Sequence, residues 1–106
     1  YPGQINGVYG HNDDMVLGAI EAIKDAGLKP GVDIKTVSVD GVKGLFEAMV
    51  AGEANVTVEC NPLLGPQLFQ ICKDLKEGKE VPKWVKSEEG VYRQETAAED
   101  IKTRKY

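Results

Sequence analysis

The sequence holds few of the residues on which several functional classes depend. Its 106 residues include two cysteines and one histidine, and two cysteines are too few to indicate a redox compartment. Lysine and arginine number 13 against 17 aspartate and glutamate residues, which gives a net charge of −4, and the two signs are interspersed. Because a nucleic-acid-binding protein normally needs a basic face, we expect no nucleic-acid partner.

Long apolar runs are missing as well. The longest fall far short of the roughly 20 residues that a membrane-spanning helix requires. A charged-then-apolar leader does not open the chain, so we expect a secretion signal to be absent or already removed. Glycine-rich phosphate loops and a Ser-His-Asp arrangement are also lacking. The sequence therefore predicts neither an enzyme nor a bound cofactor.

Alternating apolar runs and amphipathic stretches predict an α/β domain. Strands and helices are expected in alternation over residues 5–10, 15–26, 34–39, 42–51, 55–59 and 64–77. The hydrophobic fraction of 42% is ordinary for a globular protein. The repeated strand–helix unit predicts right-handed crossovers and a parallel sheet.

This alternation stops after Gly78. A strand is expected over 81–85, although Pro82 interrupts it, and another short strand over 91–93. The charged tail over 96–106 predicts a short helix or a frayed end. Since three parallel strands make a narrow sheet with two exposed edges, we expect this chain to be a piece of a larger α/β protein.

Polar residues follow each of the three predicted parallel strands. The sequence GHNDD (10–14) follows the first strand, DG (40–41) the second and CNP (60–62) the third. Open α/β sheets bind their ligands at the carboxyl ends of the strands. We therefore expect these residues to form one shared site at one edge of the sheet.

The same residues resemble a known family. The stretch YGHNDDM (9–15), followed by LGAI (17–20), resembles the strand-to-helix junction of type I periplasmic sugar-binding proteins. The stretch VSVDG (37–41) is similar to the next motif of that family, a strand ending in Asp-Gly. The stretch VTVECNP (56–62) resembles the strand that leads into the interdomain hinge. The residues of the first and third motifs are close to those of the galactofuranose-binding subgroup. The resemblance covers the whole chain, and the motifs follow one another in the same order as in the family.

This resemblance implies a three-layer α/β/α fold with a parallel sheet, of the periplasmic binding protein type I kind, that is incomplete here. Such proteins have two lobes joined by three crossovers. Residues 1–60 would then be the C-terminal part of the second lobe. Residues 61–106 would supply a hinge crossing, a helix and a strand of the first lobe, and the C-terminal tail. The missing N-terminal portion would carry the first lobe's sugar contacts.

Asn12 and Asp40 are the leading candidates for sugar contacts. An amide offers donors and acceptors, and a carboxylate accepts two strong hydrogen bonds from hydroxyl groups. From the residues alone, Asn12 is equally well explained as a helix N-cap, and Asp40 as a turn residue before Gly41. The resemblance places a ligand contact at both positions.

Three further residues complete the predicted site. His11 faces the cleft in relatives, where side chains vary, and a packed or exposed histidine remains the alternative. Cys60 stands where relatives place an amide contact, and Asn61 is the residue that could substitute for it by one register. Asp13 is expected to be structural and Asp14 solvated. A metal site formed by these two and His11 is disfavoured, because adjacent turn residues rarely converge on one ion.

The resemblance implies a solute-binding component of a sugar ABC transporter that closes around a monosaccharide and is recognised by a permease. Such a protein is periplasmic or extracellular, and lipid-anchored in a Gram-positive organism. If the chain folds alone, its exposed sheet edge favours a homodimer.

Two alternatives stay open at this point. The effector-binding core of a LacI-type transcription regulator shares the fold and the Asn-Asp motif. A receiver-like phosphorylation domain would use Asp13, Asp14 and Asp40 as an acidic pocket, although no lysine follows the later strand.

Overall fold

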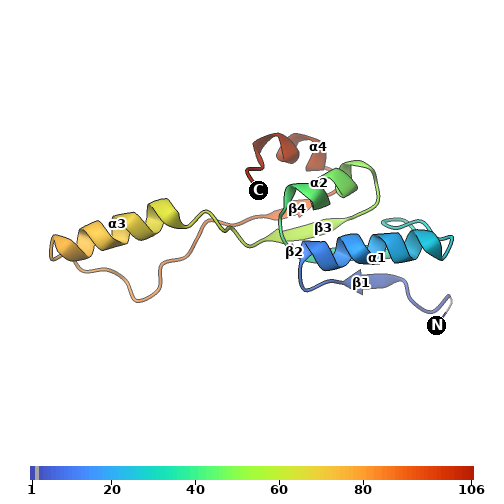
Figure 1. Cartoon of the computed structure of the whole chain (residues 1–106), viewed down its shortest axis with the longest axis horizontal. Helices are drawn as coiled ribbons and strands as arrows, with labels where there is room; N and C mark the ends of the chain where they lie inside the picture. The colour runs from blue at the N-terminus through green and yellow to red at the C-terminus, as the bar shows by residue number, and fades with distance from the viewer. Residues whose placement is uncertain (2) are drawn as a thin grey trace.

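The computed structural model describes residue 1 and residues 3–106, and it shows an elongated molecule. Its extents are 60 × 28 × 18 Å and its Cα radius of gyration is 17.7 Å, against roughly 13 Å for a compact chain of this length. A packed body, formed by residues 3–60 and 90–106, carries a projecting arm, residues 61–89 (Figure 1). The arm accounts for the excess length.

The body is built on a four-stranded sheet. Its strands are β1 (Gly7–Tyr9), β2 (Lys35–Asp40), β3 (Val56–Glu59) and β4 (Val91–Arg93), in that spatial order. The first three strands pair in parallel and β4 is antiparallel to β3. The predicted parallel arrangement of the first three strands is confirmed, as is the short strand over 91–93.

Helices α1 (Asp13–Asp25) and α2 (Lys43–Val50) pack together against one face of the sheet, as the hydrophobic pattern predicts. The short helix α4 (Ala97–Asp100) and the 3₁₀ turn η1 (Ile101–Thr103) lie against α2. The fully buried apolar side chains of this layer include Val16, Ile20, Leu45, Phe46 and Met49. The tail is therefore a packed short helix and not a frayed end.

The opposite face of the sheet carries no helix from the described part of this chain. Along β2, Ser38 is fully buried, whereas its neighbour Val37 is 39% exposed. Along β3, Thr57 is buried and Val58 is 38% exposed. Because side chains alternate between the two faces of a strand, the chain supplies the sheet and one helical layer, and leaves the second face open.

The arm holds helix α3 (Gly65–Lys76), which lies far from the sheet (Figure 1). Its predicted apolar stripe forms but faces solvent, since no residue of α3 is buried. The large apolar side chains exposed on the arm are Leu63, Leu64, Leu68, Phe69, Leu75, Trp84 and Val85. No described helix is both long and apolar enough to cross a membrane.

The strand expected over 81–85 does not form, and that prediction is wrong for this structure. Residues 79–90 have no regular secondary structure. Pro82 lacks a backbone donor, and no described strand lies beside this part of the arm. A strand without a neighbour has no ladder of hydrogen bonds to hold it.

We expect α3 to exchange its amide hydrogens much faster than α1 or α2 in the 106-residue chain. A helix of 12 residues without tertiary packing is marginal in water, whereas α1 and α2 share the buried core. Hydrogen exchange followed by mass spectrometry measures the difference directly. Equal protection of α2 and α3 would show that the arm is packed, which contradicts the structure.

Candidate functional site

Three strand ends meet at one edge of the sheet, as the sequence predicts. The Gly10 amide donates to the Val37 carbonyl at 2.9 Å, which ties the end of β1 to β2. The Cys60 amide donates to the Asp40 carbonyl at 3.0 Å, which ties the end of β3 to β2. The residues that follow β1, β2 and β3 therefore share this edge, and this edge is our candidate functional site.

Asn12 begins helix α1 and is half-buried. Its side-chain carbonyl accepts a hydrogen bond from the Met15 amide at 2.9 Å, so the predicted N-cap is confirmed. The cap uses only the carbonyl oxygen. No acceptor within residues 3–106 is bonded to the side-chain NH₂ group, which leaves its donors available for a ligand.

Asp40 is the single non-glycine residue with a positive φ among those described, at 125°. No described side chain or amide donates to its half-buried carboxylate. Burial raises the pKa of Asp40, and the nearby charges of Asp13 and Asp14 raise it further. Backbone strain of this kind costs about 1–3 kcal/mol and persists mainly at functional sites. Asp40 is thus a strained residue with an unused acceptor at the shared edge.

The other three predicted site residues have different environments. His11 is exposed, and its ring lies 5.5 Å from that of Tyr9 in a tilted arrangement. Cys60 is exposed and its thiol is free. The side-chain carbonyl of Asn61 accepts from the Leu63 amide at 2.8 Å and so starts the arm. The structure therefore gives Asn61 a local structural bond in addition to its place at the edge.

Asp13 forms a buried network beneath the candidate site. One carboxylate oxygen accepts from the hydroxyls of Ser38 at 2.5 Å and Thr57 at 2.8 Å. The other accepts from the amides of Gly41 at 2.8 Å and Val42 at 2.7 Å. The side chain is completely buried, which agrees with the structural role predicted for it and leaves it no part in an open acidic pocket.

A metal site is not formed either within the described residues. No three side chains of histidine, cysteine, aspartate or glutamate are placed to share an ion there. Asp13 already accepts four hydrogen bonds. The receiver-like and metal-binding alternatives therefore lose the residue on which both depend.

A second buried carboxylate, that of Glu59, was not predicted from the sequence. One of its oxygens accepts from Arg104 at 2.8 Å and from the Tyr106 hydroxyl at 2.6 Å. The other accepts from the Gly90 amide and the Tyr92 hydroxyl, both at 3.1 Å. The period-2 pattern of β3 places Glu59 on the same inward face as Thr57, and that pattern was the available signal.

Arg104 completes this cluster. Its guanidinium lies 5.0, 4.9 and 4.7 Å from the ring centres of Phe46, Tyr92 and Tyr106. Burial by itself raises the pKa of Glu59. The hydrogen bonds from Tyr106, Arg104 and Tyr92 lower it by more, so the pKa of Glu59 lies below its usual range. Burial and the bond to Glu59 raise the pKa of Tyr106 to about 12. The cluster fastens the C-terminal tail to the end of β3, beside the candidate site.

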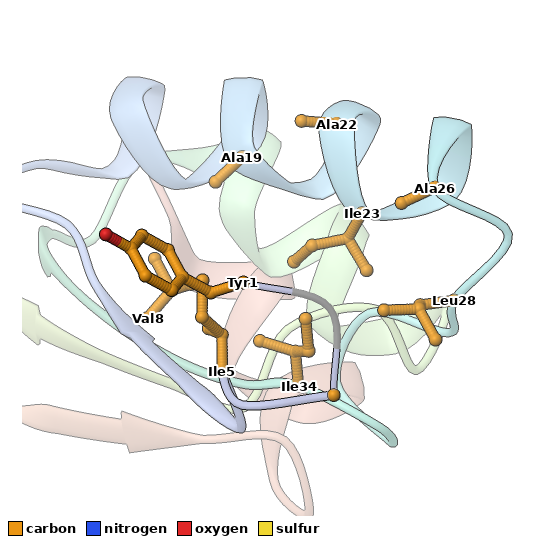
Figure 2. Close-up of a pocket in the computed structure, with 10 residues that line it drawn as sticks. Tyr1, Ile5, Val8, Ala19, Ala22, Ile23, Ala26, Leu28 and Ile34 are labelled. Atoms are coloured by element: carbon orange, nitrogen blue, oxygen red, sulfur yellow. The ribbon is translucent and has the colours of Figure 1, made fainter.

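An apolar groove of the described surface lies away from this edge. The groove is open, has a volume of about 550 Å³ and separates α1 from β1 and the N-terminal residues (Figure 2). Its lining is almost wholly apolar, with Ile5, Val8, Ala22, Ile23 and Ile34 among the side chains that face it (Figure 2). Sugar hydroxyls need convergent polar partners, so this groove does not qualify as a sugar site.

Comparisons with known proteins agree with this geometry. The chain is 48% identical over 99 residues to the galactofuranose-binding protein YtfQ of Escherichia coli, covering 92% of this chain and 31% of YtfQ. It superposes at a TM-score of 0.85 and 47% identity on the periplasmic component of the arabinose ABC transporter from Shewanella sp. ANA-3, bound to L-arabinofuranose, covering 97% of this chain and 35% of the other. A Mycobacterium smegmatis protein in complex with β-D-fucofuranose gives a TM-score of 0.88 at 44% identity, covering 99% and 34%. No family model matches the chain.

These similarities confirm the resemblance to type I periplasmic sugar-binding proteins and the predicted fold class. The relatives are sugar-binding transport proteins and not enzymes. The chain spans about a third of the length of the relatives it matches.

We expect Asp40→Gly to stabilise the protein encoded by the complete gene by about 1 kcal/mol. Glycine adopts a φ of 125° without steric strain, and that relief exceeds its entropic cost of about 0.5–1 kcal/mol. Urea denaturation measures the free energy of unfolding. Asp40→Ala is the matched control: it removes the same charge but keeps the Cβ, so its gain is smaller. A lower free energy of unfolding for Asp40→Gly than for wild type would show that the backbone at Asp40 is not strained.

Tyr106→Phe tests the Glu59 cluster through its pH dependence. At neutral pH, loss of the hydrogen bond from Tyr106 to the charged Glu59 lowers the free energy of unfolding by about 1.5–3 kcal/mol. An unfolded tyrosine ionises near pH 10, whereas Tyr106 in the fold has a pKa of about 12. The stabilisation that this hydrogen bond gives the fold is therefore complete below about pH 10 and is lost as the pH rises towards about 12. The variant should show a weaker alkaline decline in the free energy of unfolding.

An acid titration provides the complementary check on that cluster. The pKa of Glu59 is lowered in the fold. The stabilisation that its ionised carboxylate gives the fold is therefore present above the unfolded pKa of about 4.3, and it is lost as the pH falls below that value. Glu59→Gln should flatten this acid decline. An unchanged acid profile would mean that the ion pair with Arg104 does not form in solution.

Proposed function

We propose, from its homology to type I periplasmic sugar-binding proteins, that this chain is the C-terminal portion of the solute-binding component of a sugar ABC transporter. In this proposal residues 1–60 belong to the second lobe. Residues 61–106 contain the hinge crossing, the helix α3 that packs on the first lobe, and the returning tail. The ligand is held between the two lobes and released to a membrane permease.

The observation that carries the proposal is the pairing of unused polar groups at the shared edge. Among the residues that the structure describes, none accepts a hydrogen bond from the side-chain NH₂ group of Asn12, and none donates to the carboxylate of Asp40. Vicinal hydroxyls of a sugar both donate and accept hydrogen bonds, so one hydroxyl can accept from Asn12 while its neighbour donates to Asp40. His11, Cys60 and Asn61 border this pair on the adjacent strand ends.

The arm supports a two-lobed protein. Residues 61–89 leave the sheet after β3, return to it before β4, and expose a run of large apolar side chains (Figure 1). Burying such side chains is worth about 1.5–3 kcal/mol each. Their exposure is accounted for when α3 packs against a first lobe supplied by the rest of a longer chain, about three times this length, as in the relatives.

We propose a sugar in its furanose form as the ligand. The similar proteins are a galactofuranose-binding protein and two structures that hold L-arabinofuranose and β-D-fucofuranose. Their identity to this chain lies between 44% and 48%, over alignments that cover 92–99% of it. The location in this proposal is periplasmic or extracellular, with a lipid anchor in a Gram-positive organism, and the protein has no catalytic activity.

The LacI-type alternative is not favoured. It would place the same fold in a transcription regulator, whereas the relatives reported above are transport proteins. Absence of sugar binding together with specific DNA binding by the complete gene product would restore it.

Isothermal titration of the complete gene product with L-arabinose, D-galactose, D-ribose and D-fructose tests the proposal. We expect one of these sugars to bind in the micromolar range or tighter, and a carbon-13 spectrum of that sugar labelled at its anomeric carbon to show the furanose ring when bound. Binding of a pyranose ring would overturn the furanose assignment, and no binding of any sugar would overturn the function.

Two variants separate site residues from structural ones. Asp40→Asn should weaken binding about tenfold to hundredfold, because it exchanges a charged acceptor for a neutral one. Asp25→Asn, at the exposed last residue of α1 and away from the site, removes an equal charge and is the matched control that should leave the affinity unchanged. Equal affinities for wild type and Asp40→Asn would remove Asp40 from the site.

A further inference from the structure

The turn that follows β2 is held by one buried side chain. Asp40 has a φ of 125° and Gly41 a φ of 81°, and Val42 then returns to extended backbone before α2 begins. The amides of Gly41 and Val42 both donate to a single carboxylate oxygen of Asp13. Successive amides that converge on one anion form a nest, an arrangement that requires such an unusual backbone.

Without that acceptor the turn has no reason to keep its shape. A positive φ is unfavourable for aspartate and persists only where the surroundings impose it. The direction of the Gly41 amide depends on the backbone angles of Asp40, so an anion that binds this amide also fixes where the Asp40 side chain projects.

We infer that Asp13 is a positioning residue for sugar binding: its buried carboxylate holds the turn after β2 in the strained conformation that presents Asp40 to the ligand. The inference rests on the function proposed above. Asp13 itself does not touch the sugar, because it is completely buried and its four hydrogen bonds go to protein groups.

The two oxygens of Asp13 allow a control within one side chain. The oxygen that faces the turn accepts from Gly41 and Val42, whereas the other accepts from the hydroxyls of Ser38 and Thr57. Ser38→Ala removes a bond to the second oxygen and leaves the turn intact. Asp13→Ala removes both oxygens, so the amides of Gly41 and Val42 lose their acceptor. Asparagine would not serve here, because its carbonyl oxygen can face the turn while its NH₂ group donates to the two hydroxyls.

The test measures the affinity of the complete gene product for L-arabinose and the shape of the turn in the absence of sugar. Ser38→Ala should lower the unfolding temperature and leave the affinity unchanged. Asp13→Ala should weaken binding about tenfold to hundredfold, like the loss of Asp40 itself. In an Asp40→Ala background, Asp13→Ala should cause no further loss of affinity, because a residue that acts through Asp40 has nothing left to position.

The sugar-free measurement is the three-bond coupling between the amide and α protons of Asp40. This coupling is small for a φ of 125° and large for extended backbone. We expect a small value in wild type and in Ser38→Ala, and a larger value in Asp13→Ala. A wild type that binds no arabinose would count against the proposed function, while this coupling would still decide whether Asp13 holds the turn.

Two further variants test whether Asp13 acts through the turn. If Asp13→Ala does not fold, Val42→Pro removes one of the two turn donors at a φ of −74°, which suits proline, and the affinity should fall in the same way. Asp14→Ala removes an equal charge from the neighbouring, exposed position of α1 and should leave the coupling small. An Asp13→Ala protein with wild-type affinity and a small coupling would overturn the inference.

Discussion

Packing of the body depends on the buried carboxylate of Asp13. The side chain belongs to the first turn of α1, yet its bonds reach β2, β3 and the start of α2. Burying a carboxylate costs several kcal/mol unless its oxygens accept hydrogen bonds. Four donors supply these bonds to Asp13. Two of the donors are hydroxyls at inward positions of the sheet, Ser38 and Thr57. The position of α1 on the sheet is therefore fixed by polar geometry as well as by the apolar core.

The carboxylates near the shared edge have opposite environments. Asp13 and Glu59 are buried and each accepts four hydrogen bonds, so they belong to the rigid framework. Asp40 has no described partner, a strained backbone and a raised pKa. Rigid groups beneath a single unsatisfied group are the arrangement expected of a preorganised binding surface, since the framework resists relaxation of the group that waits for a ligand.

Much of the fold could be predicted because local patterns determine it. The periodicity of residues 15–26 and 42–51 gives the faces of α1 and α2, and Asn12 gives the start of α1. The strand over 81–85 was wrong because β-propensity says nothing about whether a partner strand lies alongside. The cluster around Glu59 could not be predicted, because it joins residues 45 and 47 positions apart. Asp40 was identified as a site candidate by its place after a strand, whereas its strained φ is a tertiary effect of Asp13.

The long separations of these bonds bear on the order in which the chain becomes complete during synthesis. Asp13 lacks one of its donors until Thr57, 44 residues later, has been made. Glu59 lacks Arg104 and Tyr106 until the last residues of this sequence emerge. At a translation rate of about 5–20 residues per second, both carboxylates wait for seconds without their partners. The body therefore cannot reach its final packing until both sets of partners, the second of which includes Tyr106, have been made.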